Sequence, residues 1–377
     1  MGTPKKILFI TGTRADFGKI KPLIRETQKS QFEPYIFATG MHLLSRYGYT
    51  VLEIQKSGFE NIFTHFNQTG SNNHDMDLAL AHTIQGLALY VREFLPDLIV
   101  VHGDRIETLA GAVVGALNNI PVAHIEGGEL SGTVDELIRH SVSKLSHLHF
   151  VAHEEARRRL VQMGEREDSI FVIGSPDVDI MLSADLPNLV EVKKKYEIPF
   201  SEFAIFIYHP VTTELSHLKD NVESVAQALR ACALNFVVIY PNNDQGSEII
   251  FEMYKSFTDH PRFRILPSMR FEYFLTLLKN SVAIVGNSSC GIREAPIYGI
   301  PTVNIGTRQK NRFHYPSILN VPDSTEEILS ALKHLPKGVA PSVYFGKGDS
   351  ACRFIECLCD PEIWNIPRQK QFLDLKK

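Results

Sequence analysis

The chain has 377 residues and a formal net charge of −4 at pH 7, so it is long enough for two domains of ordinary size. This charge balance lacks the basic excess of nucleic-acid-binding proteins, so no nucleic-acid partner is expected. Five cysteines, an odd number spread along the chain, indicate reduced thiols rather than a disulfide framework. The sequence shows no signal-peptide pattern and no apolar run of about 18 residues, so we expect a cytoplasmic protein that does not bind membranes.

Strand-like apolar runs alternate with helix-like segments through the first half of the chain, which is typical of βαβ units and a parallel sheet. A helix is expected over residues 76–91, where apolar residues recur at helical spacing, and Pro96 ends this pattern. The polar residues 68–75 before it predict a mobile loop. Six strands are expected in this half: Lys6–Thr11, Tyr35–Thr39, Leu98–His102, Val122–Ile125, Leu148–Ala152 and Ile170–Ile173.

A linker and a short charged helix are expected within residues 183–199, after which the alternating pattern starts again. We therefore expect an α/β protein with two doubly wound domains that face a common cleft, over residues 1–180 and 188–349. A helix-like segment, residues 350–359, opens the stretch 350–377, which we expect to pack back across the junction. Five strands are expected in the second domain: Phe203–Tyr208, Phe236–Tyr240, Arg264–Leu266, Val282–Val285 and Thr302–Ile305.

Two acidic corners follow predicted strands at the point where each apolar run ends. Asp104 comes after the strand Leu98–His102, and Glu126 comes after the strand Val122–Ile125. Because ligands bind outside the carboxyl ends of the strands in an open parallel sheet, the two carboxylates should lie in one crevice. Two carboxylates in one crevice suit proton transfer at carbon.

Polar clusters follow nearly every other predicted strand as well. Loops are polar in any case, but several of these side chains together suit an anionic ligand. Neither a dinucleotide fingerprint nor a Walker loop is present. We therefore expect phosphate binding at residues 287–291, which open a predicted helix that reaches Tyr298 and whose free N–H groups attract anions. The alternative is that Ser288 is a plain helix N-cap. The side chains that suit an anion are Arg14, His209, Ser288 and Arg308.

Three more carboxylates allow a functional and a structural interpretation. Glu294 lies on the predicted helix after residue 289, where it either accepts both hydroxyls of a ribose or is solvated. Glu136 belongs to a capping-box pattern with Thr133, so we expect it to stabilise a helix start. Asp135 either pairs with Arg139 one turn away or has a catalytic role. No catalytic metal is expected, because the histidines and carboxylates that could bind one would have to converge from separate strands.

Six polar segments stand at predicted strand ends: Thr11–Asp16, His102–Arg105, His124–Glu129, His209–Glu214, Gly286–Gly291 and Gly306–Gln309. In this order they resemble the motifs of the hydrolysing UDP-N-acetylglucosamine 2-epimerases. The resemblance runs from about Lys5 to the region of Trp364 and Asn365, which is nearly the whole chain, and it is strongest to the bacterial enzymes of sialic acid biosynthesis.

The resemblance implies a GT-B-like fold, in which two Rossmann-like domains hold a nucleotide sugar between them. It implies that Asp104, Glu126 and Asp135 are catalytic acids and that His209 acts with them. It implies a UDP-sugar as partner, no cofactor, and a homodimer or homotetramer. The UDP contacts that it implies are Arg14, Arg105, His209, Asn242, Phe274, Ser288, Ser289, Glu294 and Arg308.

The expected reaction begins with departure of UDP from C1 of UDP-N-acetylglucosamine, which acidifies the hydrogen at C2. A carboxylate removes that proton to give 2-acetamidoglucal, and addition of water with reprotonation from the opposite face gives N-acetylmannosamine. The same chemistry on UDP-N,N′-diacetylbacillosamine, on the route to legionaminic acid, is the nearest alternative. A catalytically silent nucleotide-sugar sensor, a GT-B glycosyltransferase and a metal hydrolase are alternatives from other classes.

Overall fold

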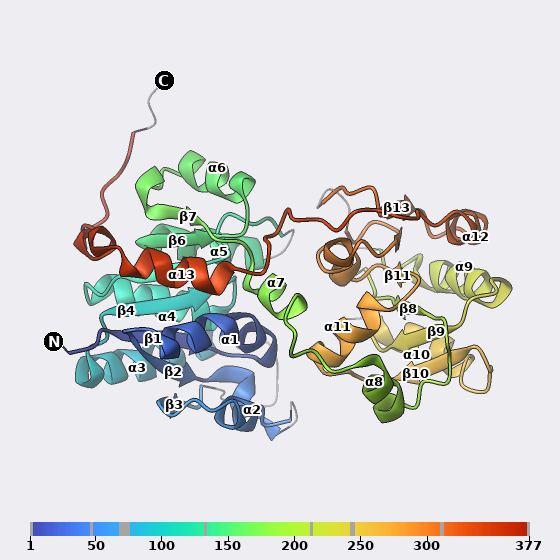
Figure 1. Ribbon diagram of the computed structural model, residues 1–377, viewed down its shortest axis with the longest axis horizontal. Coiled ribbons are helices and arrows are strands. Elements are labelled where there is room, and N and C mark those ends of the chain that lie inside the picture. Colours follow the sequence, from blue (N-terminus) through green and yellow to red (C-terminus); the bar gives the residue numbers. More distant parts are fainter. Residues whose placement is uncertain are drawn as a thin grey trace. The chain divides into compact units, whose positions relative to one another are not determined.

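The computed structural model divides into two compact units, each with its own parallel sheet. Unit 1 consists of residues 1–182 together with 346–377, and unit 2 consists of residues 183–345 (Figure 1). The expected loop over residues 68–75 lies outside the described part of the chain. The described residues are 3–45, 48–67, 76–131, 134–211, 214–241, 246–309 and 313–374.

Unit 1 contains a seven-stranded sheet in the order β3-β2-β1-β4-β5-β6-β7, with every neighbouring pair parallel. The chain moves outward from β1 to β3 and then returns to place β4 beside β1, so the winding direction reverses between these two strands. Ligands bind at such a switch point in open α/β sheets. The strands are β1 Lys6–Thr11, β2 Glu33–Ala38, β3 Ile62–Thr64, β4 Leu98–His102, β5 Val122–Ile125, β6 Leu148–Val151 and β7 Ile170–Val172.

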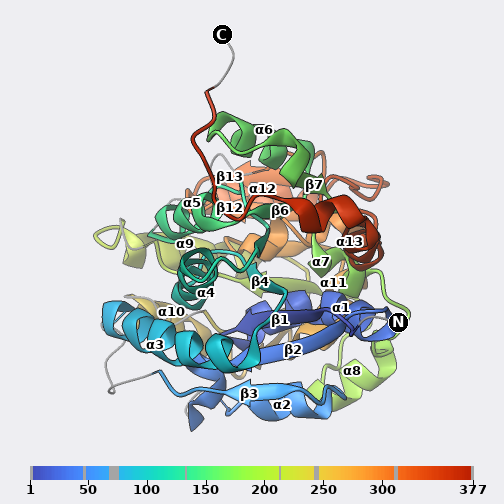
Figure 2. The same cartoon turned by 90° about the vertical axis from the view of Figure 1, so that its left-hand side faces the viewer.

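Helices cover both faces of this sheet, as the apolar character of its strands requires. Helices α3, α4 and α5 lie on one face, and α1, α7 and α13 lie on the other (Figure 2). The helices of unit 1 are α1 Arg14–Lys29, α2 Val51–Lys56, α3 Met76–Phe94, α4 Ile106–Leu117, α5 Val134–Leu145, α6 Glu154–Gln162, α7 Pro176–Met181 and α13 Ser350–Cys359, with 3₁₀ turns η1 Gly40–Leu43, η3 Glu167–Ser169 and η6 Pro361–Asn365.

Helix α13 completes the core of unit 1 although it lies far along the sequence from the strands that it covers. Its Phe354 is fully buried and packs against the rings of Phe9 in β1 and Phe150 in β6. The N–H groups of Ser350 and Ala351 at the start of α13 donate to Asp179 of α7. Unit 1 is therefore built from two separate stretches of the chain.

Unit 2 contains a six-stranded parallel sheet in the order β10-β9-β8-β11-β12-β13. Its winding direction reverses between β8 and β11, which gives it a switch point of the same kind. The strands are β8 Ala204–Ile207, β9 Phe236–Ile239, β10 Phe263–Leu266, β11 Ile284–Gly286, β12 Thr302–Ile305 and β13 Ile318–Val321.

The main core of unit 2 forms where α9, α10 and α12 pack on its sheet. Phe206 of β8 and Val303 of β12 are fully buried there against Val225 of α9 and Ile328 of α12. The helices of unit 2 are α8 Leu189–Tyr196, α9 Leu218–Ala231, α10 Ser247–Lys255, α11 Phe271–Lys279 and α12 Thr325–Lys333, with 3₁₀ turns η4 Ser289–Gly291 and η5 Ala295–Tyr298.

The architecture is thus α/β, with two doubly wound parallel sheets, as the sequence predicts. The strands that the sequence predicts are all present, with bounds that differ by a few residues, and two edge strands, β3 and β13, are additional. In the described ranges, every helix falls short of the length or the apolar character needed to cross a bilayer.

Candidate functional site

The loop after β1 is shaped by a capping box at the start of α1. Thr13 is the N-cap and accepts from the N–H of Asp16 at 3.2 Å, while the Asp16 carboxylate accepts from the N–H of Thr13 at 3.1 Å. The Asp16 carboxylate also accepts from the N–H of Gly12 at 3.0 Å and from the Thr11 hydroxyl. This arrangement leaves Arg14 exposed at the switch point of unit 1, where its Nε lies 3.0 Å from Glu53 Oε2.

The first acidic corner follows β4. Asp104 is 24% exposed in its side chain, and its carboxylate accepts a hydrogen bond from Arg139 of α5, a residue that is only 9% exposed. Asp135 lies one turn before Arg139, in the exposed first turn of α5. The structure thus gives Asp104 a cationic partner that the sequence analysis had considered only for Asp135.

The expected capping role of Glu136 takes a different form. Its carboxylate accepts from the N–H of Ser131 at 2.8 Å, while Thr133 lies outside the described residues. Arg105, the residue after Asp104, is the exposed N-cap of α4 and lies 3.6 Å from the buried carboxylate of Glu107.

The second acidic corner follows β5, and its carboxylate is buried among polar groups. Glu126 is 4% exposed and has a left-handed backbone, with φ of 62°. Its Oε2 lies 3.3 Å from His102 Nε2 and 3.5 Å from Lys19 Nζ, and its Oε1 accepts from the Ser175 hydroxyl. Lys19 also lies 2.9 Å from Asp177. A carboxylate held between a lysine and a histidine has the partners that proton transfer requires.

The two acidic corners lie on neighbouring strands. Strands β4 and β5 pair in parallel, with His102 opposite Ile125, so both carboxylates follow the same edge of the sheet, at neighbouring strand ends. The buried His124 contacts the first corner through hydrogen bonds. Its Nε2 lies 2.8 Å from the carbonyl of Gly103, and its Nδ1 lies 3.1 Å from the Ser143 hydroxyl.

The protonation state of His124 follows from its burial. Desolvation lowers the pKa of His124 to about 3, so the ring is neutral at pH 7. Its Nε2–H therefore donates to the Gly103 carbonyl, and its Nδ1 accepts from Ser143. Among the residues described, no group of three or more histidine, cysteine, aspartate or glutamate side chains is arranged to hold a metal ion.

In unit 2, reciprocal hydrogen bonds join the two strands of the switch point. The N–H of His209 donates to the Asn287 side-chain oxygen at 2.7 Å, and the Asn287 amide donates to the His209 carbonyl at 2.8 Å. Gly286 has φ of 125°, and a Cβ there would lie 1.9 Å from the Ile207 carbonyl oxygen, so this close approach of β8 and β11 requires glycine.

The prediction of one helix, opened by residues 287–291 and reaching Tyr298, is wrong. Two short 3₁₀ turns, η4 and η5, occupy this stretch instead. The reason is Pro296, which cannot donate to a preceding carbonyl and whose ring clashes with the turn before it. Ser288 is the N-cap of η4, but its side chain makes no capping hydrogen bond and instead accepts from the Cys290 thiol.

The loop after β12 is joined to Asn287 by hydrogen bonds. Arg308 Nη1 and Gln309 Nε2 both donate to the Asn287 carbonyl, at 3.2 and 2.9 Å. The Thr307 hydroxyl donates to Glu214 at 2.6 Å. Through Asn287, the structure thus brings together three groups that the sequence predicts for anion binding: His209, Ser288 and Arg308.

The remaining predicted residues of unit 2 are placed as follows. Ser289 begins η4, and Glu294 is half-buried at the N-cap of η5. Phe274 is buried in α11, as its spacing with other apolar residues indicates. Asn242 lies outside the described residues.

Residues 25–359 match the model of a protein family described as UDP-N-acetylglucosamine 2-epimerase. The chain belongs to the UDP-N-acetylglucosamine 2-epimerase family. A family member of that name from Neisseria meningitidis serogroup B is 46% identical, over 98% of this chain and 99% of that protein. A UDP-N,N′-diacetylbacillosamine 2-epimerase (hydrolyzing) from Legionella pneumophila is 35% identical, over 98% of both chains. The polysialic acid biosynthesis protein P7 of Escherichia coli is 33% identical, over 87% of this chain and 85% of that protein.

Solved structures of this epimerase family share the fold. The UDP-GlcNAc 2-epimerase of Methanocaldococcus jannaschii superposes with a TM-score of 0.78 at 21% identity, over 94% of this chain and 99% of that one. The Neisseria meningitidis enzyme bound to UDP-GlcNAc gives a TM-score of 0.77 at 22% identity, over 94% and 99%. The fold of the present chain is therefore GT-B-like.

Several polar groups of the site were missed by the sequence analysis. Lys19 and Ser175 contact Glu126, Asp177 contacts Lys19, and Arg139 pairs with Asp104. Lys19 and Arg139 lie on amphipathic helices, and a single cation on such a helix is predicted from sequence to face solvent. Only the three-dimensional arrangement of α1, α5 and α7 around the strand ends reveals these partners.

Proposed function

We propose that this chain is a hydrolysing 2-epimerase that converts UDP-N-acetylglucosamine into N-acetylmannosamine and UDP through 2-acetamidoglucal. The observation that carries the proposal is the pair of acidic corners, Asp104 and Glu126, at adjoining strand ends of a chain that is 46% identical to a UDP-N-acetylglucosamine 2-epimerase along its whole length. In this proposal, unit 1 acts on the sugar and unit 2 binds the UDP moiety.

The proposed chemistry explains why more than one acid is needed. As UDP departs from C1, positive charge develops there and acidifies the C2 hydrogen, so a carboxylate can remove it. Inversion at C2 then requires proton return from the other ring face, and hence a second acid–base group. We assign these steps to Asp104, Glu126 and Asp135 with His209, each of which contributes roughly 10²–10⁴-fold when well placed.

The proposed UDP site of unit 2 uses the groups joined by Asn287. His209, Ser288 and Arg308 would meet the negative charge that develops on the leaving diphosphate, where charged donors are strongest. From unit 1, the exposed cations Arg14 and Arg105 would offset more of this negative charge. Asn242, Phe274, Ser289 and Glu294 complete the proposed contacts to UDP.

We further propose a role in sialic acid biosynthesis in the cytoplasm, as a homodimer or homotetramer. The E. coli relative named for polysialic acid biosynthesis supports the pathway, and five free cysteines fit a reducing compartment. The proposed reaction needs no redox cofactor, because C1 and C2 of the sugar are neither oxidised nor reduced overall. Light scattering of the purified protein measures the oligomeric state.

The decisive experiment is an NMR time course with UDP-N-acetylglucosamine in D₂O. We expect UDP release together with N-acetylmannosamine that carries deuterium at C2. Retention of the original hydrogen at C2 would exclude the elimination route, and UDP release without a new C2 configuration would indicate simple hydrolysis. Asp104→Asn should lower kcat by roughly 10²–10⁴-fold. It should also cost stability, because the buried Arg139 is left without its carboxylate partner.

The alternative substrate, UDP-N,N′-diacetylbacillosamine, is supported by the 35% identical Legionella protein of that activity. Both substrates undergo the same chemistry at C1 and C2, so only the pocket around C4 and C6 distinguishes them. The ratio of kcat/KM for the two substrates, measured side by side, decides between them, and we expect UDP-N-acetylglucosamine to be preferred.

A further inference from the structure

A segment that follows η6 is fastened to unit 1 by consecutive polar contacts. Arg368 Nη1 and Gln369 Nε2 donate to the backbone and the side chain of Asn119, at 3.0 and 2.8 Å, and His147 Nε2 lies 3.0 Å from the Arg368 carbonyl. We call residues 366–374 the tail segment. Figures 1 and 2 show it running from η6 past α6. These contacts fix the residue that follows them, Lys370.

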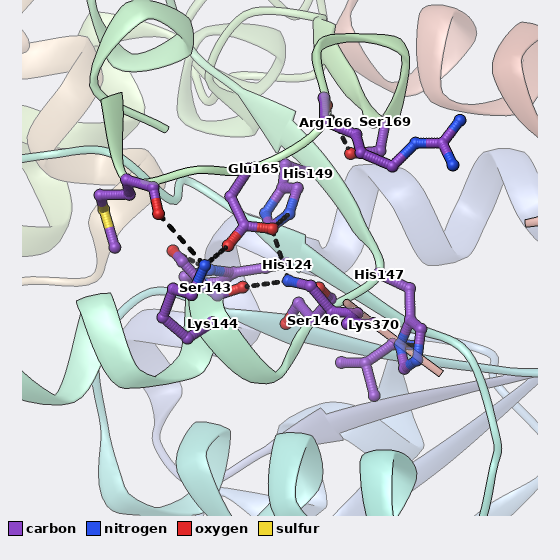
Figure 3. A network of polar contacts seen from close by, with 12 residues as sticks. His124, Ser143, Lys144, Ser146, His147, His149, Glu165, Arg166, Ser169 and Lys370 are labelled. Carbon is purple, nitrogen blue, oxygen red and sulfur yellow. Dashed lines mark hydrogen bonds and ion pairs between the residues drawn. The ribbon is translucent and has the colours of Figure 1, made fainter. Parts of the chain in front are cut away.

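Lys370 stabilises the C-terminal end of α5. Its ammonium group donates to the carbonyls of Ser146 and Ser143 at 2.6 and 3.3 Å (Figure 3). The last carbonyls of a helix carry its negative dipole end, so a cation there is favourable, although the Ser143 carbonyl also accepts from the N–H of Ser146 at 3.2 Å. A lysine from a distant part of the sequence therefore caps the helix that carries Asp135 and Arg139.

The same ammonium group forms an ion pair with the buried carboxylate of Glu165. This glutamate is 1% exposed and also contacts Lys144 at 2.8 Å and His149 Nε2 at 3.1 Å (Figure 3). Burial alone would raise its pKa, but the hydrogen bond from His149 and the charges of the two lysines outweigh burial and lower the pKa of Glu165 to about 2. Glu165 is thus an anion that holds Lys370 in place.

A chain of hydrogen bonds leads from Lys370 to the first acidic corner. Ser143, whose carbonyl accepts from Lys370, donates its hydroxyl to His124 Nδ1 at 3.1 Å. His124 in turn donates from Nε2 to the Gly103 carbonyl at 2.8 Å. Gly103 immediately precedes Asp104, and α5 supplies Arg139 to that carboxylate. Lys370 thus supports Asp104 by two routes, through His124 and through the position of α5.

We propose that Lys370 is a positioning residue for the reaction, which sets the placement of Asp104 and of the α5 side chains without touching the substrate. This inference rests on the proposed function. Loss of the ammonium group would free the end of α5 and leave Glu165 with one lysine fewer. Small displacements of acid–base groups reduce the chemical step much more than they reduce substrate binding.

The test compares Lys370→Met with Lys144→Met. Both variants remove a lysine from Glu165, but Lys144 is half-exposed and donates to the Met163 carbonyl rather than to the end of α5. At a temperature well below unfolding, we expect Lys370→Met to lower kcat by roughly ten- to hundredfold, with KM changed by less than about twofold. Lys144→Met should keep kcat within about twofold of the wild type.

Hydrogen–deuterium exchange gives a readout that needs no substrate. We expect faster exchange over residues 134–146 in Lys370→Met, and exchange like that of the wild type in Lys144→Met. Lys370→Gln, which keeps a donor for the two carbonyls, should lie between Lys370→Met and the wild type and replaces Lys370→Met if that variant does not fold.

The inference would be overturned if the Lys370 variants kept the kcat and the hydrogen exchange of the wild type. It would also be overturned if Lys144→Met lowered kcat and increased exchange as much as Lys370→Met does. A wild-type protein that does not turn over UDP-N-acetylglucosamine refutes the proposed function instead, and the exchange of α5 still reports on the positioning role.

Discussion

The two carboxylates that follow β4 and β5 have different surroundings. Asp104 is partly exposed and is paired with Arg139, whereas Glu126 is enclosed by Lys19, His102 and Ser175. Glu126 also holds a left-handed backbone, which costs a non-glycine residue roughly 1–2 kcal/mol. Strain of this kind persists where the surrounding structure fixes it, and it is concentrated at functional sites. The left-handed backbone of Glu126 therefore favours a functional role for its carboxylate.

A matched pair of glutamates in one loop tests this carboxylate. Glu126→Gln keeps the size of the side chain but cannot carry the proton, so we expect kcat to fall by roughly 10²–10⁴-fold. Glu129 lies three residues later and pairs with His153 at 3.0 Å, so Glu129→Gln should retain activity within about tenfold of the wild type. Steady-state release of UDP measures both variants, and equal losses in the two would contradict a specific role for Glu126.

At the residue scale, the sequence predicted those groups of the site that stand at strand ends. Asp104 and Glu126 follow apolar runs, so their position at the sheet edge could be read without a structure. The partners Lys19 and Arg139 could not be predicted, because a cation on a helix surface gives no indication of which strand end it meets. His124 was placed in a strand, but its contact with the Gly103 carbonyl depends on the pairing of β4 with β5.

At the scale of single elements, two helices of unit 1 carry an internal glycine in opposite settings. Gly18 lies within α1, and a Cβ there would meet no atom within 4 Å. Gly111 lies within α4, and a Cβ there would lie 2.5 Å from Ile10 and 2.6 Å from Val101. Gly18 therefore only lowers the helix propensity of α1, whereas Gly111 lets α4 approach the sheet closely.

Alanine at these two positions should change stability in opposite directions. Gly18→Ala should raise the free energy of unfolding by about 0.5–1 kcal/mol, because it reduces the entropy of the unfolded chain without a clash. Gly111→Ala should lower it by about 1–3 kcal/mol, because the added methyl group overpacks the face of the sheet. Urea denaturation measures both values, and a destabilised Gly18→Ala would show that its surroundings are not open.

The elements that sequence patterns located best are long or fully buried. Strands β1, β4 and β5 and helix α13 agree with the predicted bounds at both ends. The missed strands, β3 and β13, are short edge strands whose residues are largely half-exposed or exposed, so they lack the continuous apolar run of a central strand. The predicted helix that reaches Tyr298 does not form as a continuous element, because it contains Pro296, which breaks a helix.

At the scale of the whole molecule, several histidines are buried in the neutral form. Desolvation lowers the pKa of His42 to about 4 and that of His124 to about 3. His42 is held between the hydroxyls of Thr11 and Thr50, at 3.0 and 2.8 Å. In the unfolded chain both rings would bind a proton near pH 6.5. The folded state thus binds fewer protons than the unfolded state below that pH.

Stability should therefore fall in mild acid. Because the pKa values are lowered on folding, the contribution of each ring is complete above about pH 6.5 and is lost as the pH falls towards 4, by about 2 kcal/mol per ring at pH 5. Thermal denaturation from pH 7 to pH 4.5 should show this decline. His42→Gln should flatten it, and His334→Gln, at an exposed position of unit 2, should not. A constant melting temperature over this range would contradict the prediction.

The division of unit 1 into two stretches of sequence has a consequence for synthesis. A nascent chain leaves the ribosome from its amino end, so unit 2 is complete before α13 emerges. Until then, Phe9 and Phe150 lack the cover that Phe354 gives them in the finished unit, so the core of unit 1 is incomplete. The half of the protein that carries the acidic corners is therefore translated first and finished last.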